Sequence, residues 1–178
     1  MKTRRKTHPA APTQPLLLLR FAIKRDGTPV LSLTRRDGTV AWQRQDGFFP
    51  LHDLTHYAVE TVLGLRQAFY GMMADGWEFA DFGHPWPRGP MPNVADALLG
   101  EVTAGCFGLF AREHADDAAG ADALNQHLAE YCRQHGVEPL RTITPDEFGR
   151  IRRLREEVQV RWQALKPGEA MEVAFEVE

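Results

Sequence analysis

The chain has 178 residues, close to the usual size of one domain and enough to bury a single core. Its hydrophobic fraction of 43% and charged fraction of 25% are those of a folded soluble protein. The formal net charge of −3 at pH 7 is too small to indicate a polyanionic or polycationic partner, and it gives no nucleic-acid signal.

Residues 1–15 combine a basic start with Ala, Pro and Thr and show no apolar periodicity. We predict a disordered basic tail here, followed by one domain over residues 16–178. The apolar run that begins at Leu16 is cut off by Arg20, so it is shorter than the roughly 7 to 15 apolar residues of a signal peptide. No run approaches the roughly 20 apolar residues of a membrane span, so we expect no membrane association.

Three apolar or β-branched segments follow, at 16–24, 30–34 and 40–45. They are separated by Asp26-Gly27 and Asp37-Gly38, dipeptides that favour primed hairpin turns. We therefore predict a three-stranded antiparallel meander.

The pattern changes to a helical period after Gly47. Pro50 suits the first turn of a helix, and the apolar residues up to Leu63 recur at helical spacing until Gly64. Cap and stop signals predict further helices at 65–74, 93–111, 121–134 and 144–165. The proline-rich and glycine-rich segment 77–92 is predicted to be a loop whose aromatic residues pack on the body of the protein.

The last segment, 170–177, alternates apolar and polar residues as a strand with one buried face does. It has to pair with the N-terminal meander, because an isolated strand cannot satisfy its own backbone groups. We therefore predict an α+β fold, in which an antiparallel sheet of the N-terminal meander plus this C-terminal strand packs against a layer of about five helices.

Residues 48–60 depart from ordinary globular chemistry, since His52 and His56 stand four residues apart beside Asp53 and Glu60. On a helix, residues four apart lie about 40° apart around the axis, so both imidazoles can turn a nitrogen toward one ion. If each residue advances about 100° around the helix axis, both histidines also fall at the edge of the apolar arc that holds Val59. We expect both rings to point inward or into a cleft, where their nitrogens need a metal ion or a carboxylate as partner.

A third ligand is expected from another element. Glu60 lies roughly 12 Å along the axis from His52, at about 1.5 Å per residue, so it suits a supporting role better than a share of the same ion. Glu101 is the only charge between Asp96 and Arg112 on an apolar, glycine-rich helix, and it is the candidate third ligand. A salt bridge to an arginine is the alternative explanation for Glu101.

The string HDLTH at positions 52–56 resembles the HExxH helix of zincin metallopeptidases, with Asp in place of Glu. The resemblance implies zinc, or another divalent transition metal, at His52, His56 and Glu101, with Asp53 as general base near the bound water. Asp is one methylene shorter than Glu, and a base must come within about 3 Å of the proton it takes, so the resemblance favours binding over hydrolysis. The wider segment 50–60 is also similar to small bacterial proteins with no assigned function.

Other candidate groups carry less weight. His84 lies in a loop that could approach the site, and Cys132 with His135 has the spacing of half a zinc site without a second half.

The two cysteines of the chain, Cys106 and Cys132, argue against a secreted disulfide framework, so we expect a cytoplasmic location. The arginines of the last helix are interleaved with glutamates, which predicts an ion-paired, solvated face.

Two classes of function follow. In the first, the protein is a small cytoplasmic metal-binding protein, in its finer form a zinc-dependent hydrolase in which Asp53 or Glu60 takes a proton from a metal-activated water. Its partner would be an unknown small molecule or peptide. In the second, it is a non-enzymatic binding or interaction protein whose His, Asp and Glu residues form a structural polar network. A homodimer is considered for this class. The aromatic loop 77–86 would then make the contact surface.

Overall fold

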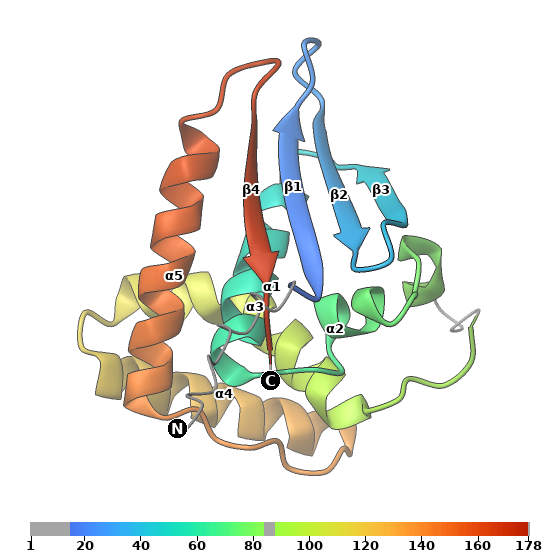
Figure 1. Ribbon diagram of the computed structural model, residues 1–178. Coiled ribbons are helices and arrows are strands. Elements are labelled where there is room, and N and C mark those ends of the chain that lie inside the picture. The colour runs from blue at the N-terminus through green and yellow to red at the C-terminus, as the bar shows by residue number, and fades with distance from the viewer. Residues whose placement is uncertain (1–14, 84–87, 178) are drawn as a thin grey trace, which may run out of the picture.

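In the computed structural model, which describes residues 15–83 and 88–177, four strands form one antiparallel sheet in the order β3-β2-β1-β4 (Figure 1). The strands are β1 (Leu17–Ile23), β2 (Pro29–Arg35), β3 (Val40–Arg44) and β4 (Ala170–Phe175). Leu19 of β1 lies between Leu33 of β2 and Val173 of β4, and all three side chains are buried. The last strand therefore pairs with the meander, as predicted.

The two turns of the meander differ from the predicted primed type. The Lys24 amide bonds to the Thr28 carbonyl, and the Gly27 amide bonds back to the Lys24 carbonyl, which makes a three-residue loop. Among the described residues only glycines have a positive φ, so Gly27 (φ 84°) turns the chain and Asp26 does not. A primed turn with Asp26-Gly27 at its centre would need a positive φ at Asp26, whereas this loop places its one positive φ at the glycine. The turn at Gly38 has the same pattern.

The helices are α1 (Phe49–Leu63), α2 (Phe69–Ala74), α3 (Val94–Glu113), α4 (Asp117–His135) and α5 (Pro145–Gln163), with the short 3-10 helix η1 (Phe79–Phe82) after α2. The helix predicted at 65–74 begins only at Phe69, and the one predicted from 121 begins at Asp117. The earlier start of α4 follows from Asp116, whose carboxylate accepts a hydrogen bond from the Ala119 amide at 2.9 Å and caps the helix. Gly64 ends α1 with a φ of 67°, as predicted.

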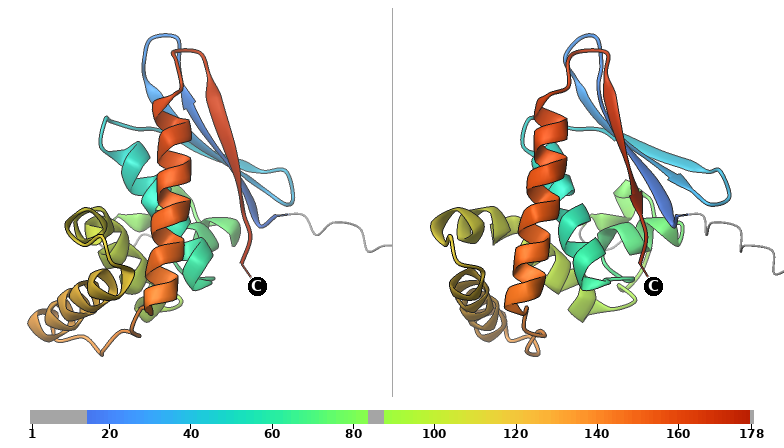
Figure 2. Two further views of the ribbon diagram at one scale, coloured as in Figure 1. Left: turned by 90° about the vertical axis from the view of Figure 1, so that its left-hand side faces the viewer. Right: turned by 60° about the vertical axis from the view of Figure 1, so that its left-hand side comes forward.

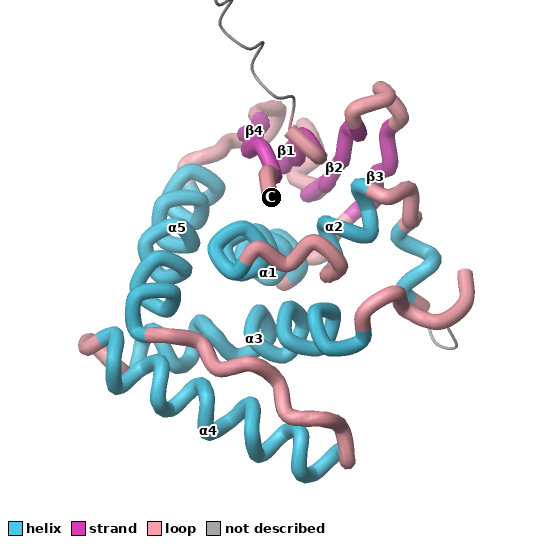
Figure 3. Tube along the Cα trace, turned by 60° about the horizontal axis from the view of Figure 1, so that its bottom comes forward, coloured by secondary structure: helices cyan, strands magenta, loops and turns pink. Residues whose placement is uncertain are grey.

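The helices lie at two depths below the sheet. α1 lies directly under the inner face of the sheet, and α3 and α4 lie beyond it (Figure 3). Figure 2 shows α4 on the side of the molecule away from the sheet, at the foot of α5. The predicted α+β class is confirmed, and the structure adds that α1 is enclosed rather than part of an outer layer.

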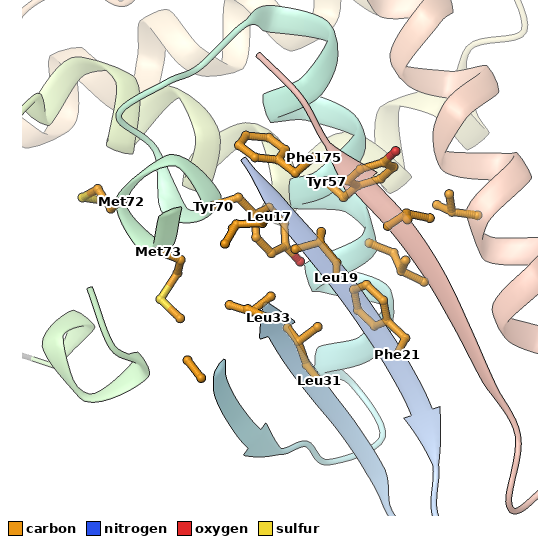
Figure 4. Packing of buried hydrophobic residues seen from close by; sticks show 14 of the residues in the cluster. Leu17, Leu19, Phe21, Leu31, Leu33, Tyr57, Tyr70, Met72, Met73 and Phe175 are labelled. Carbon is orange, nitrogen blue, oxygen red and sulfur yellow. The ribbon is translucent and has the colours of Figure 1, made fainter. Parts of the chain in front are cut away.

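α1 is buried on nearly all sides. Leu54 and Tyr57 join the cluster under the sheet (Figure 4), whereas Ala58 and Val59 join a second cluster with α3, α4 and α5. The sequence placed the buried arc of α1 on the Val59 side alone, with Leu54 and Tyr57 opposite. Both sides are covered in the fold, because the sheet and the outer helices each supply an apolar surface.

One described helix, α3, is long and apolar enough to cross a membrane by length and composition alone. This differs from the expectation, drawn from the sequence, that no segment approaches the length and apolar character of a membrane span. Its inward face, with Leu99 and Phe107, packs in the second cluster, and Val94 and Leu109 are exposed. A single helix of this kind is a weak indication of a membrane location, since helices of soluble proteins pass the same test.

The predicted disordered tail lies outside the described residues except for Pro15, whose carbonyl accepts a hydrogen bond from Arg36 Nε at 3.1 Å. The single-domain assignment of residues 16–178 stays a prediction.

Two helical glycines test how tightly the outer helices pack. A Cβ at Gly120 of α4 would lie 2.5 Å from the ring of Phe148, whereas a Cβ at Gly105 of α3 would meet nothing within 4 Å. We expect Gly120→Ala to lower the free energy of unfolding by about 1–3 kcal/mol through overpacking. Gly105→Ala should raise it by about 0.5–1 kcal/mol, because alanine loses less backbone entropy. Urea unfolding of both variants measures the difference, and equal effects would contradict the described α4–α5 contact.

Candidate metal centre

His52 and His56 lie on consecutive turns of α1, and their rings meet edge to face with centroids 4.7 Å apart. The start of the helix is set by Asp46, whose carboxylate accepts hydrogen bonds from the amides of Phe48 and Phe49. Phe48 then stacks on His52 with ring centroids 5.5 Å apart. The two histidines therefore share one side of the helix, as their spacing predicts.

Glu101 comes from α3, and its carboxylate faces both imidazoles. One oxygen lies 3.1 Å from His56 Nε2 and the other 3.8 Å from His52 Nε2. Gly100, the preceding residue, allows this approach, because a Cβ there would lie 3.2 Å from the Ala68 side chain. The three predicted ligands are thus brought together, and the alternative of an arginine partner for Glu101 does not occur among the described contacts.

The three ligand atoms lie within 4.8 Å of one another, so His52, His56 and Glu101 could hold a metal ion. Two ligand atoms on a tetrahedral zinc ion with bonds of about 2.1 Å are about 3.4 Å apart. The spacings of 3.8 and 3.1 Å, each to a different oxygen of Glu101, bracket that value, and any wider separation within the 4.8 Å limit would have to shorten on metal binding. No other group of this kind was found in the described parts of the chain.

Glu60 is fully buried behind His56. One of its oxygens lies 2.9 Å from His56 Nδ1, and the other accepts a hydrogen bond from the Tyr70 amide at 2.8 Å. A carboxylate at Nδ1 favours the tautomer that leaves Nε2 free as a ligand, which is the usual support for a metal-binding histidine. Glu60 therefore holds His56 from the far side, and it is not among the residues that line the adjoining cavity.

The charges around the two histidines make them unequal. Burial alone would lower the pKa of His56, but hydrogen bonds to Glu101 and Glu60 and their negative charges outweigh burial and raise it to about 10. Burial, together with the charge of His56, lowers the pKa of His52. The hydrogen bond from His56 lowers the pKa of Glu101. Burial raises the pKa of Glu60, against the hydrogen bond and charge of His56. Without a metal, these shifts favour a protonated His56 beside a neutral His52.

Asp53 is buried beside the site and lines the same cavity. Its carboxylate accepts a hydrogen bond from the Gln45 amide, and its backbone carbonyl accepts one from the Tyr70 hydroxyl at 3.0 Å. Burial raises the pKa of Asp53 to about 7, against the opposing influence of His56 and of the Gln45 hydrogen bond. The carboxyl is therefore a group able to exchange a proton near neutral pH.

Gln45 and Tyr70 are site residues that the sequence analysis missed. A signal for Gln45 existed, because the alternation of β3 continues past its end and puts Gln43 and Gln45 on the same side as buried Ala41. Nothing local marked Tyr70, whose amide meets Glu60 only through the fold of the chain between α1 and α2.

A cavity of about 570 Å³ opens beside the three ligands. Its lining comes from β3, from the helices α1, α2, η1, α3 and α4, and from the segment before α3: Gln43, Phe49, His52, Asp53, His56, Phe69, Met72, Phe79, Phe82, Met91, Ala97, Leu98, Glu101 and Tyr131. The side chain of Glu101 is 65% exposed and that of His56 only 5%, so the site is reached from the α3 side. A metal bound here would have an open position toward the cavity.

His84 and Trp86 lie outside the described residues. Cys132 and His135 do not line the cavity. Cys132 is buried and His135 is exposed, with its ring against Tyr131 at 4.3 Å. The described part of the aromatic loop packs inward, as predicted, since Trp77 is buried and contacts Phe82 with ring centroids 5.4 Å apart.

No protein-family model, no curated protein and no solved structure matches this chain.

Proposed function

We propose that this protein binds a divalent transition metal, with zinc as the first candidate, through His52, His56 and Glu101. The observation that carries the proposal is the convergence of three ligand atoms from two helices within 4.8 Å, at the wall of a cavity. Catalytic zinc sites have three protein ligands and one open position, whereas structural sites are closed by four. The arrangement supports a catalytic or ligand-binding metal.

The finer proposal is a metal-dependent hydrolase. A bound zinc ion would supply a water of lowered pKa at the open position. Asp53 is the residue we assign as proton acceptor, because it lines the cavity and is adjacent to a ligand in the chain. We assign Glu60 a positioning role instead of the base role also considered for it, since both of its oxygens are engaged behind His56. We place the protein in the cytoplasm in this proposal, in keeping with two free cysteines.

A second candidate function, a non-enzymatic binding protein, is favoured by one observation. His56 already has a carboxylate on each ring nitrogen, so the cluster is satisfied as a polar network without a metal. The two candidates differ in metal content. Protein purified without chelators should hold one metal per chain under the first, and chelator treatment should then lower its melting temperature. Absence of metal uptake and no effect of chelator would support the second.

The ligand role of Glu101 is best tested by Glu101→Gln, because the side chain is largely exposed and the change keeps its shape, and circular dichroism checks that the variant folds. We expect zinc affinity to fall by more than the roughly 10- to 100-fold that is typical of changes outside the ligand set. Isothermal titration calorimetry gives the affinity. The matched control is Glu113→Gln, an exposed glutamate on the same helix, which should bind zinc as the wild type does. Equal affinities of the two variants would contradict the assignment.

The positioning role of Glu60 is tested by Glu60→Gln. The amide has one acceptor oxygen, so if that oxygen accepts from the Tyr70 amide, the NH2 group faces His56 Nδ1 and can only donate to it. Such a bond favours the tautomer with its proton on Nε2, which removes that nitrogen as a ligand. We expect zinc affinity to fall roughly 10- to 100-fold. Circular dichroism checks the fold. Unchanged zinc affinity in a folded variant would show that Glu60 does not position His56.

The base role of Asp53 is tested with zinc-loaded protein and p-nitrophenyl acetate, an uncharged aromatic ester. Asp53→Asn removes the proton acceptor while keeping the shape of the side chain, so we expect the rate to fall by roughly 100-fold or more. Zinc content is measured in parallel and should stay at the wild-type level. A variant with full zinc and the wild-type rate would make the base assignment wrong.

A further inference from the structure

The cavity beside the metal centre has a distinct charge pattern. Its polar or partly polar lining consists of Gln43, the two imidazoles, Asp53, Glu101 and Tyr131, and no lysine or arginine of the described chain lines it. Arg88 is directed elsewhere, since its guanidinium lies over the Trp77 ring and bonds to the Gly76 carbonyl. Even with a divalent ion in place, the carboxylates of Glu60 and Glu101 offset its charge. Both ring nitrogens of His56 already face carboxylates, those of Glu60 and Glu101. An anionic ligand would therefore lose its hydration here without gaining a cationic side chain that is free to pair with it.

The remaining lining is aromatic and flexible. The Phe69 ring contacts three other rings of this lining, with centroids 4.9 Å from Phe82, 6.1 Å from Phe79 and 5.6 Å from His56. The aromatic wall therefore continues up to a metal ligand. Met72 and Met91 complete it, and methionine side chains adapt to irregular apolar shapes. A cavity of about 570 Å³ with such walls and a few converging polar groups suits a small organic molecule.

We propose that this cavity binds an uncharged small molecule with an aromatic or bulky apolar group, and that it rejects anionic molecules such as phosphate esters and carboxylates. The apolar group would lie against Phe69 and Phe82, which leaves its polar end at the open position near His52 and His56. As a statement about the substrate, this inference rests on the proposed metal-dependent function. The preference for uncharged ligands follows from the cavity walls and needs no metal.

Two dyes of the same skeleton test the charge preference: N-phenylnaphthylamine is uncharged, and anilinonaphthalene sulfonate carries a sulfonate. Fluorescence titration of the metal-free, full-length protein should show saturable binding of the uncharged dye at one site. The sulfonate should bind at least about tenfold more weakly. Equal or tighter binding of the sulfonate, or no saturable binding of the uncharged dye, would overturn the proposal.

Two matched truncations test the location. Phe82→Ala removes part of the cavity wall and should lower the affinity for the uncharged dye about tenfold. Phe110→Ala removes a partly buried ring of α3 that does not line the cavity, and it should leave the affinity unchanged. Circular dichroism checks that both variants fold. If the two variants lose affinity equally, or neither does, the dye does not occupy this cavity and the proposal fails.

The same titrations with zinc-loaded protein separate this inference from the proposed function. If zinc does not bind but the dyes discriminate as expected, the metal assignment fails and the cavity preference stands. If zinc binds with the expected dependence on Glu101 but the dyes do not discriminate, the metal site stands and the ligand class is wrong.

Discussion

His56, held between Glu60 and Glu101, is the interaction on which the rest of the structure depends. It ties α1 to α3 through Glu101 and to the start of α2 through Glu60, whose second oxygen accepts from the Tyr70 amide. The first turn of α2 has no side-chain cap of its own. Glu60 therefore serves a backbone donor that would otherwise be unsatisfied in the core. A buried ionised group is costly unless it is paired and hydrogen-bonded, and this arrangement provides both.

The same geometry that satisfies His56 without a metal also prepares it to bind one. Glu60 fixes the ring from the Nδ1 side, so Nε2 points to Glu101 and to the space shared with His52. A metal ion would replace a proton between Nε2 and the Glu101 carboxylate, and the contact with Glu60 would remain. The structural network and the metal centre are thus two occupancies of one cluster, and the difference between them is a matter of metal affinity and not of fold.

The position of α1 explains why the cluster adjoins a cavity. The helix is enclosed by the sheet on one side and by the outer helices on the other, so among its polar residues only Thr61 and, on the side of the cavity, His52 are partly exposed. On the cavity side, the chain between α2 and α3 supplies Phe79, Phe82 and Met91. Polar groups are left at the base of an apolar recess, which is the usual composition of a small-molecule site.

Much of this protein was predictable from the sequence by itself. The alternation of apolar and polar residues predicted the strands, and capping residues predicted most helix ends. The four-residue spacing of His52 and His56 placed them on one side of α1. Glu101 stood out as a lone carboxylate on an apolar helix. These are local patterns, set by the periods of helix and strand. The contacts of Glu60, Gln45 and Tyr70 were decided only by the tertiary structure, as were the cavity and the enclosure of α1 on both sides. Each of these depends on contacts between residues far apart in the chain, and no local period records which surfaces will meet.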